Sequence, residues 1–147
     1  MPAATTTALD LILRNGHVID PSQNIDGVMD VGFRDGKAAG VGKALKAGPK
    51  TVVRDVLGHV VTPGLIDLHT HVYWGGTSLG IDANEFCRTS GVTTSVDTGS
   101  AGPGNFAGFR RHVIERSEAR ILAYLHVSFA GIFGFSKTIM VGESKNM

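Results

Sequence analysis

The chain has 147 residues, of which 42% are hydrophobic, enough for the core of an ordinary globular domain. Its 14 basic and 13 acidic side chains nearly cancel, and no cluster of Lys or Arg indicates a nucleic-acid or membrane-surface partner. There is no signal-peptide pattern at the start and no apolar run as long as a membrane span, so we expect a cytoplasmic protein. Cys87 is the only cysteine, which excludes an intrachain disulfide and a thiolate metal cluster.

Residues 1–61 have the pattern of short strands joined by tight turns. Apolar residues flank both Asn15-Gly16 and Asp35-Gly36. Asn-Gly and Asp-Gly tolerate the positive φ angles of a two-residue hairpin turn, so each pair predicts a hairpin. The first part of the chain is therefore expected to be all-β.

A corner at Thr62-Pro63-Gly64 opens the second part of the chain, residues 62–147. Strand-like and helix-like segments then alternate, which predicts right-handed βαβ units and a parallel sheet. The expected strands are 65–71, 92–99 and 120–129, and the expected helices are 81–91 and 105–119. Three strands cannot close an eight-stranded barrel, which needs roughly 200 to 250 residues. We therefore expect the N-terminal part of a longer protein, or the product of a truncated reading frame.

The first strand of the second part ends in His69 and His71. Residues two apart on a strand point the same way, roughly 6.5 Å apart at Cα, so two imidazoles can converge on one ion. The same alternation predicts Asp67 on their side, one layer deeper, and Leu68 and Thr70 facing the helices. A bare His-x-His also arises by chance among surface or core histidines. Its place at the carboxyl edge of an α/β sheet favours the metal site.

The stretch VVTPGLIDLHTH, preceded by VRDVLGH, resembles the signature of the amidohydrolase superfamily. The likeness continues through SGVTTSVDTGSAGPGNF, which is similar to the second strand and following loop of the deacetylase branch, a group often named dihydroorotase. It covers essentially the whole chain from LILRNGHVIDP onward. The resemblance implies an α/β protein with a small composite β-sandwich domain at residues 1–61. Residues 62–147 would supply strands 1–3 of an incomplete (β/α)8 TIM-type barrel.

The resemblance also implies a metal-dependent hydrolase. His69 and His71 would bind one or two divalent ions, usually zinc, with the catalytic residues and further ligands beyond Met147. A metal-activated water would hydrolyse a small N-acyl amide or acetyl ester. Dihydroorotases carry an arginine where this sequence has Tyr73, which argues against their substrate. Tyr73 and Trp74 are predicted to wall the substrate pocket, although aromatic residues in such positions pack equally well as core.

Two other interpretations stay open. The chain is either part of a dihydroorotase-like or hydantoinase-like cyclic amidase, or an inactive remnant or interaction module. The partners expected of the enzyme are a small-molecule substrate and copies of the chain itself. Self-association is expected because a three-stranded sheet has two unpaired edges. Because two histidines leave a zinc shell unfilled, we predict weak or absent metal binding and no turnover for residues 1–147 alone. Asp97 is expected to form hydrogen bonds in its loop, and His126 to be structural.

Overall fold

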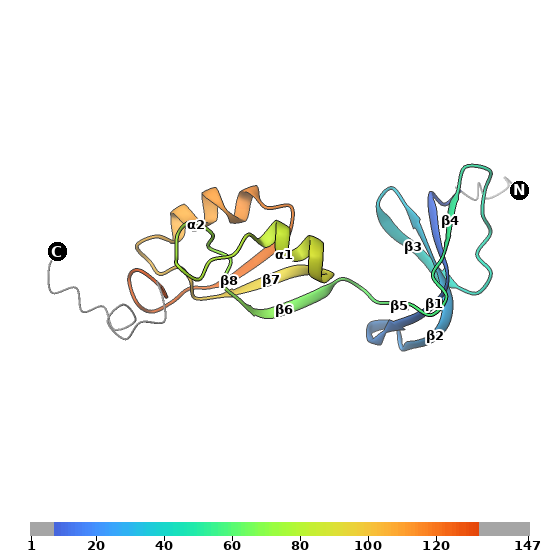
Figure 1. Cartoon of the computed structure of the whole chain (residues 1–147), viewed down its shortest axis with the longest axis horizontal. Coiled ribbons are helices and arrows are strands. Elements are labelled where there is room, and N and C mark those ends of the chain that lie inside the picture. Colours follow the sequence, from blue (N-terminus) through green and yellow to red (C-terminus); the bar gives the residue numbers. More distant parts are fainter. Residues whose placement is uncertain (1–7, 133–147) are drawn as a thin grey trace, which may run out of the picture. The chain divides into compact units, whose positions relative to one another are not determined.

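The structure is a computed structural model that describes residues 8–132. The chain divides into two compact units between Pro63 and Gly64, within the corner where proline and glycine interrupt the strand pattern (Figure 1). Each unit contains its own β-sheet. Among the described residues, no helix has the length and apolar character needed to cross a membrane.

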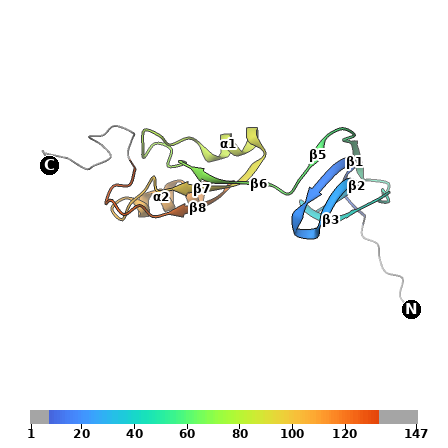
Figure 2. The same ribbon diagram turned by 90° about the horizontal axis from the view of Figure 1, so that it is seen from below.

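The first unit is built around one long central strand. This strand, β1, pairs antiparallel with β2 and parallel with β4 and β5. β3 extends the sheet beyond β2 (Figure 2). A 3-10 turn, η1, connects β1 to β2. Residues 8–63 form this single sheet, so the sandwich stays a prediction. The bounds are β1 Leu11–Asp20, η1 Pro21–Gln23, β2 Ile25–Arg34, β3 Lys37–Gly42, β4 Val52–Asp55 and β5 Val60–Val61.

The hairpin turn predicted at Asp35-Gly36 is present, whereas the prediction of a turn at Asn15-Gly16 is wrong. Asp35 and Gly36 join β2 to β3 with φ angles of 51° and 70°, as a two-residue turn requires. Asn15 also has a positive φ, 63°, but it lies inside β1, where the register with β2 shifts before Gly16. The Asn-Gly pair therefore makes a β-bulge within a continuous strand.

The bulge in β1 exists because residues far along the chain hold it. The carboxylate of Asp30, which is 4% exposed, accepts hydrogen bonds from the Asn15 amide at 3.1 Å and from the Leu45 amide at 3.0 Å. Gly16 meets β5 so closely that a Cβ at this position would lie 2.6 Å from Val61 Cγ2. Gly16 therefore allows β5 to pack closely against β1, and it does not form part of a turn.

The second unit is a parallel sheet with the order β6-β7-β8, as the alternation of segments predicts. Helices α1 and α2 lie on the same side of this sheet (Figure 1). α2 is shorter than expected, because the chain passes into the 3-10 turn η2 after it. The bounds are β6 Leu65–Thr70, α1 Ala83–Ser90, β7 Val92–Thr98, α2 Phe106–His112, η2 Ile114–Arg116 and β8 Arg120–Tyr124.

The helix-covered side of the sheet contains the core of the second unit. Asp82 caps α1 by accepting hydrogen bonds from two backbone amides, and Gly91 ends the helix with a φ of 74°, both as predicted. Leu68 is 71% exposed, so the prediction that it packs beneath the helices is wrong. The residues buried under the helices are Val72, Ala83, Ala101, Phe109 and Ile121.

Candidate metal centre

The carboxyl end of β6 departs from simple strand alternation. Its register with β7 shifts between Asp67 and Thr70, and Asp67 Oδ1 accepts a hydrogen bond of 3.0 Å from the backbone amide of His69. The register places Asp67 beside Ser95, whose hydroxyl lies 3.7 Å from Cys87 Sγ on α1. Asp67 is thus on the helix side of the sheet, and the prediction that it lies beneath the histidines is wrong. Its carboxylate shapes the irregular strand end that presents them.

His69 and His71 lie next to each other at this strand end. Their ring centroids are 5.7 Å apart and the ring planes are inclined at 76°. His69 is exposed and His71 is half-buried. An ion bound to a ring nitrogen at the usual distance lies roughly 3 Å from the ring centroid, so two rings that share it have centroids at most roughly 6 Å apart. The observed separation fits two ligands of one divalent cation.

A buried carboxylate connects the end of β6 to the loop after β7. Asp97 has no exposed surface, and its two oxygens accept hydrogen bonds from the amides of Val72, at 2.8 Å, and Ser100, at 2.7 Å. Ser100 is also completely buried, and its Oγ lies 2.9 Å from His71 Nδ1. Asp97 therefore forms the loop hydrogen bonds expected of it. Ser100 was not identified from the sequence, because nothing in a glycine-rich loop marks one serine as the partner of a distant histidine.

The described part of the chain supplies no third metal ligand beside the pair. No group of three His, Cys, Asp or Glu side chains in the described residues is arranged to hold an ion. His126 accepts a hydrogen bond of 2.9 Å at Nδ1 from the Ser128 amide, in the structural role predicted for it. Both oxygens of Asp97 are occupied by amides. Within residues 8–132 the donor set is therefore two imidazoles, which fits part of a catalytic zinc shell.

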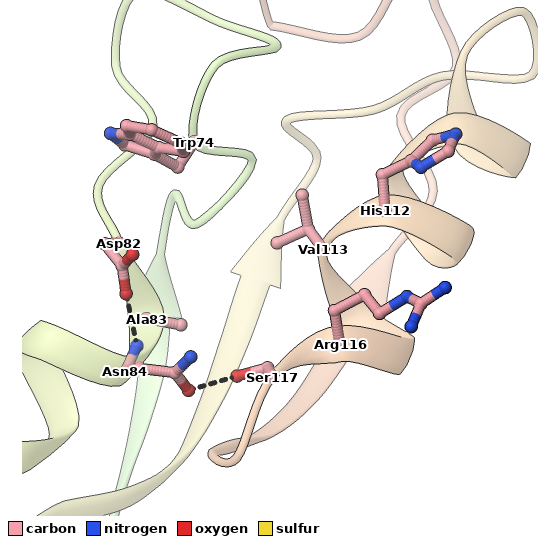
Figure 3. Close-up of a pocket in the computed structure, with 8 residues that line it drawn as sticks. All are labelled: Trp74, Asp82, Ala83, Asn84, His112, Val113, Arg116 and Ser117. Carbon is pink, nitrogen blue, oxygen red and sulfur yellow. Dashed lines mark hydrogen bonds between the residues drawn. The ribbon is translucent and has the colours of Figure 1, made fainter.

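The two aromatic residues that follow the histidines lie away from them. The Tyr73 ring stacks on Phe109, with centroids 4.6 Å apart, and packs against the core, which is the alternative that the sequence left open. Trp74 is 63% exposed and lines a cavity of about 210 Å³ between the start of α1 and the end of α2, opposite Val113 (Figure 3). Neither His69 nor His71 lines this cavity.

Comparison with known proteins identifies the family. No protein-family model matches the chain. A deacetylase from Agrobacterium fabrum is 42% identical over 113 residues, which cover 77% of this chain. A dihydroorotase from Geobacter metallireducens is 45% identical over 64 residues, covering 44% of this chain. The chain belongs to the amidohydrolase superfamily.

The match to other amidohydrolases extends to their fold. A crystal structure of a dihydroorotase superimposes on 84% of this chain with a TM-score of 0.74 and 37% sequence identity. The alignment covers 33% of that structure, 28% of the Agrobacterium deacetylase and 15% of the Geobacter dihydroorotase. This amidohydrolase chain thus spans about a third or less of the proteins it matches.

Proposed function

We propose that this chain carries the first metal-binding pair of a metal-dependent amidohydrolase of the deacetylase type. The observation that carries the proposal is the adjacency of His69 and His71, with centroids 5.7 Å apart at the carboxyl end of β6. Parallel α/β sheets gather their catalytic groups at this edge. The identity to a deacetylase over 77% of the chain supports the same assignment.

The proposed reaction is hydrolysis of a small N-acyl amide or acetyl ester. A divalent cation, zinc in our proposal, would supply a Lewis acid for this reaction. His69 and His71 would each contribute one nitrogen, and Ser100 would hold the second ring. We assign the other ligands and the proton-transferring group to the part of the whole polypeptide that corresponds to the two thirds of the dihydroorotase structure outside the aligned region. The composite sandwich and the cytoplasmic location also remain proposals.

A cyclic amide is the second candidate substrate, because dihydroorotases are 45% identical over part of the chain. Against it stands the position two residues after His71. Dihydroorotases resembling this chain would have an arginine there to bind a substrate carboxylate, whereas Tyr73 packs on Phe109. A side chain in that position does not offer a positive charge to a substrate held by the histidines. The deacetylase reading is therefore favoured.

The proposal is tested on the whole polypeptide encoded by the reading frame that contains this chain. Hydrolysis of N-acetylated amino acids, acetyl esters and dihydroorotate is measured with the purified protein after chelation and after adding back zinc. Zinc should restore hydrolysis of the acyl substrates. His69→Ala and His71→Ala should each lower kcat/KM by about a thousandfold or more, since a metal supplies several kcal/mol of transition-state stabilisation. His59→Ala, which removes an exposed histidine from the first unit, is the matched control.

Residues 1–147 alone give a second measurement. Two imidazoles should bind zinc weakly, without turnover, because catalytic zinc sites ordinarily have three protein ligands. Stoichiometric zinc that resists a chelator in this chain would contradict the two-ligand site. Hydrolysis that is unaffected by chelation, or hydrolysis of dihydroorotate alone, would contradict the proposed deacetylase. A whole polypeptide with no activity on any of these substrates would favour an inactive remnant.

A further inference from the structure

The ring of His71 is connected to the loop after β7 by hydrogen bonds between buried polar groups. Asp97 accepts amide hydrogen bonds from Val72, the neighbour of His71, and from Ser100, the residue whose hydroxyl meets the ring. One carboxylate thus fixes the backbone on both sides of the Ser100–His71 contact. Asp97 and Ser100 both have no exposed surface, so solvent does not compete for these bonds.

The contact occupies one particular nitrogen of His71. Ser100 Oγ lies 2.9 Å from Nδ1, which leaves Nε2 as the nitrogen available to an ion. A neutral imidazole bound to a metal through Nε2 carries its proton on Nδ1, and that proton needs an acceptor. A serine hydroxyl oxygen accepts such a hydrogen bond. Ser100 is therefore placed to select both the orientation of the ring and the nitrogen that it offers.

Among the described residues, the ring of His69 has no side-chain partner equivalent to Ser100. Asp67 bonds to its backbone amide, and no side chain in residues 8–132 makes a hydrogen bond to its ring. The ring of His69 is exposed and contacts the edge of His71. The two histidines therefore differ: the ring of His71 is fixed by a hydrogen bond before an ion binds, whereas the ring of His69 can adjust its orientation to the ion.

We infer that Ser100 is a positioning residue that presents Nε2 of His71 to a divalent cation, with Asp97 fixing Ser100 in place. This inference rests on the proposed function, in which His71 is a metal ligand. Partners of ligating histidines typically change metal affinity by about 10- to 100-fold when they are removed. Ser100→Ala should therefore weaken zinc binding to this chain by about tenfold or more.

The experiment measures the ligating nitrogen as well as the affinity. ¹⁵N-histidine-labelled chain is titrated with zinc at about pH 8, and the ring nitrogens are followed by NMR. In the wild type, Nε2 of His71 should show the shift of a bound nitrogen while Nδ1 stays protonated. In Ser100→Ala, affinity should fall and His71 should bind through a mixture of its two nitrogens. Ser95→Ala is the matched control, because Ser95 is also fully buried on β7 but lies on the α1 side.

The possible outcomes separate this inference from the proposed function. Wild-type affinity and Nε2 ligation in Ser100→Ala would overturn the positioning role and leave the metal site intact. Zinc bound through Nδ1 of His71 in the wild type would also overturn it, even if the variant fails to fold. The same titration on the whole polypeptide tests the proposed function itself, which would be overturned if neither histidine there showed a zinc-dependent shift at millimolar zinc.

Discussion

Replacing Asp97 with asparagine tests the framework that supports the candidate centre. The wild-type carboxylate accepts two amide hydrogen bonds at 2.8 and 2.7 Å with no solvent exposure. Asparagine keeps one acceptor oxygen and turns an NH₂ group toward the second amide, which is then buried without a partner. Losing one charged hydrogen bond and leaving one buried donor unpaired should cost about 2–4 kcal/mol. Urea unfolding of the second unit, followed by amide hydrogen exchange at Val72 and Ser100, measures this loss.

The control for Asp97→Asn is Glu118→Gln, which makes the same chemical change on an exposed side chain of the same unit. Glu118 is paired with Arg88 at 3.7 Å, and both side chains are largely exposed, so its replacement should change stability by less than about 1 kcal/mol. Exchange at Val72 and Ser100 should accelerate only in Asp97→Asn. Equal stability of the two variants, with unchanged exchange at both amides, would refute the reasoning.

Two further predictions concern packing and pH. A Cβ at Gly102 would collide with backbone atoms of the loop after β8, so Gly102→Ala should cost at least about 1–3 kcal/mol, whereas Gly40→Ala, with open space around it, should not. Equal melting temperatures would contradict this. Hydrogen bonds from Ser22 and then Gln23 lower the pKa of Asp20 below 3.8. Its stabilising contribution is therefore complete above that unfolded value and is lost as pH falls through the lower folded value. Asp20→Asn should flatten the acid unfolding curve of the first unit, and superimposable curves would count against the assignment.

Local signals in the sequence are accurate where neighbouring residues determine the structure. Asp82 and Gly91 mark the ends of α1, because a cap and a left-handed terminus are decided within a few residues. The Asn15-Gly16 signal predicts a positive φ correctly at Asn15 alone, and its prediction of a turn is wrong. Whether such a pair turns the chain or bulges a strand depends on Asp30 and on β5, which local patterns do not include.

The candidate centre shows the same division. The spacing of His69 and His71 after an apolar strand is enough to predict two neighbouring imidazoles. The register shift at Asp67 and the Ser100–His71 contact both depend on pairing with β7. Strand alternation alone therefore predicts the wrong side of the sheet for Asp67 and does not predict Ser100 as the partner of His71. The sequence alone does not separate a core from a pocket position for Tyr73, because its stacking on Phe109 depends on how α2 packs.

The central position of β1 has a consequence for how the chain emerges during synthesis. β1 begins at Leu11, but its parallel partners start only at Val52 and end at Val61. Pairings between distant segments form late, and an unpaired strand edge invites contact with other chains. A nascent chain arrested on the ribosome before Val52 would expose one flank of β1 to chaperones, whereas a chain extended well past Pro63 could already hold a closed first unit.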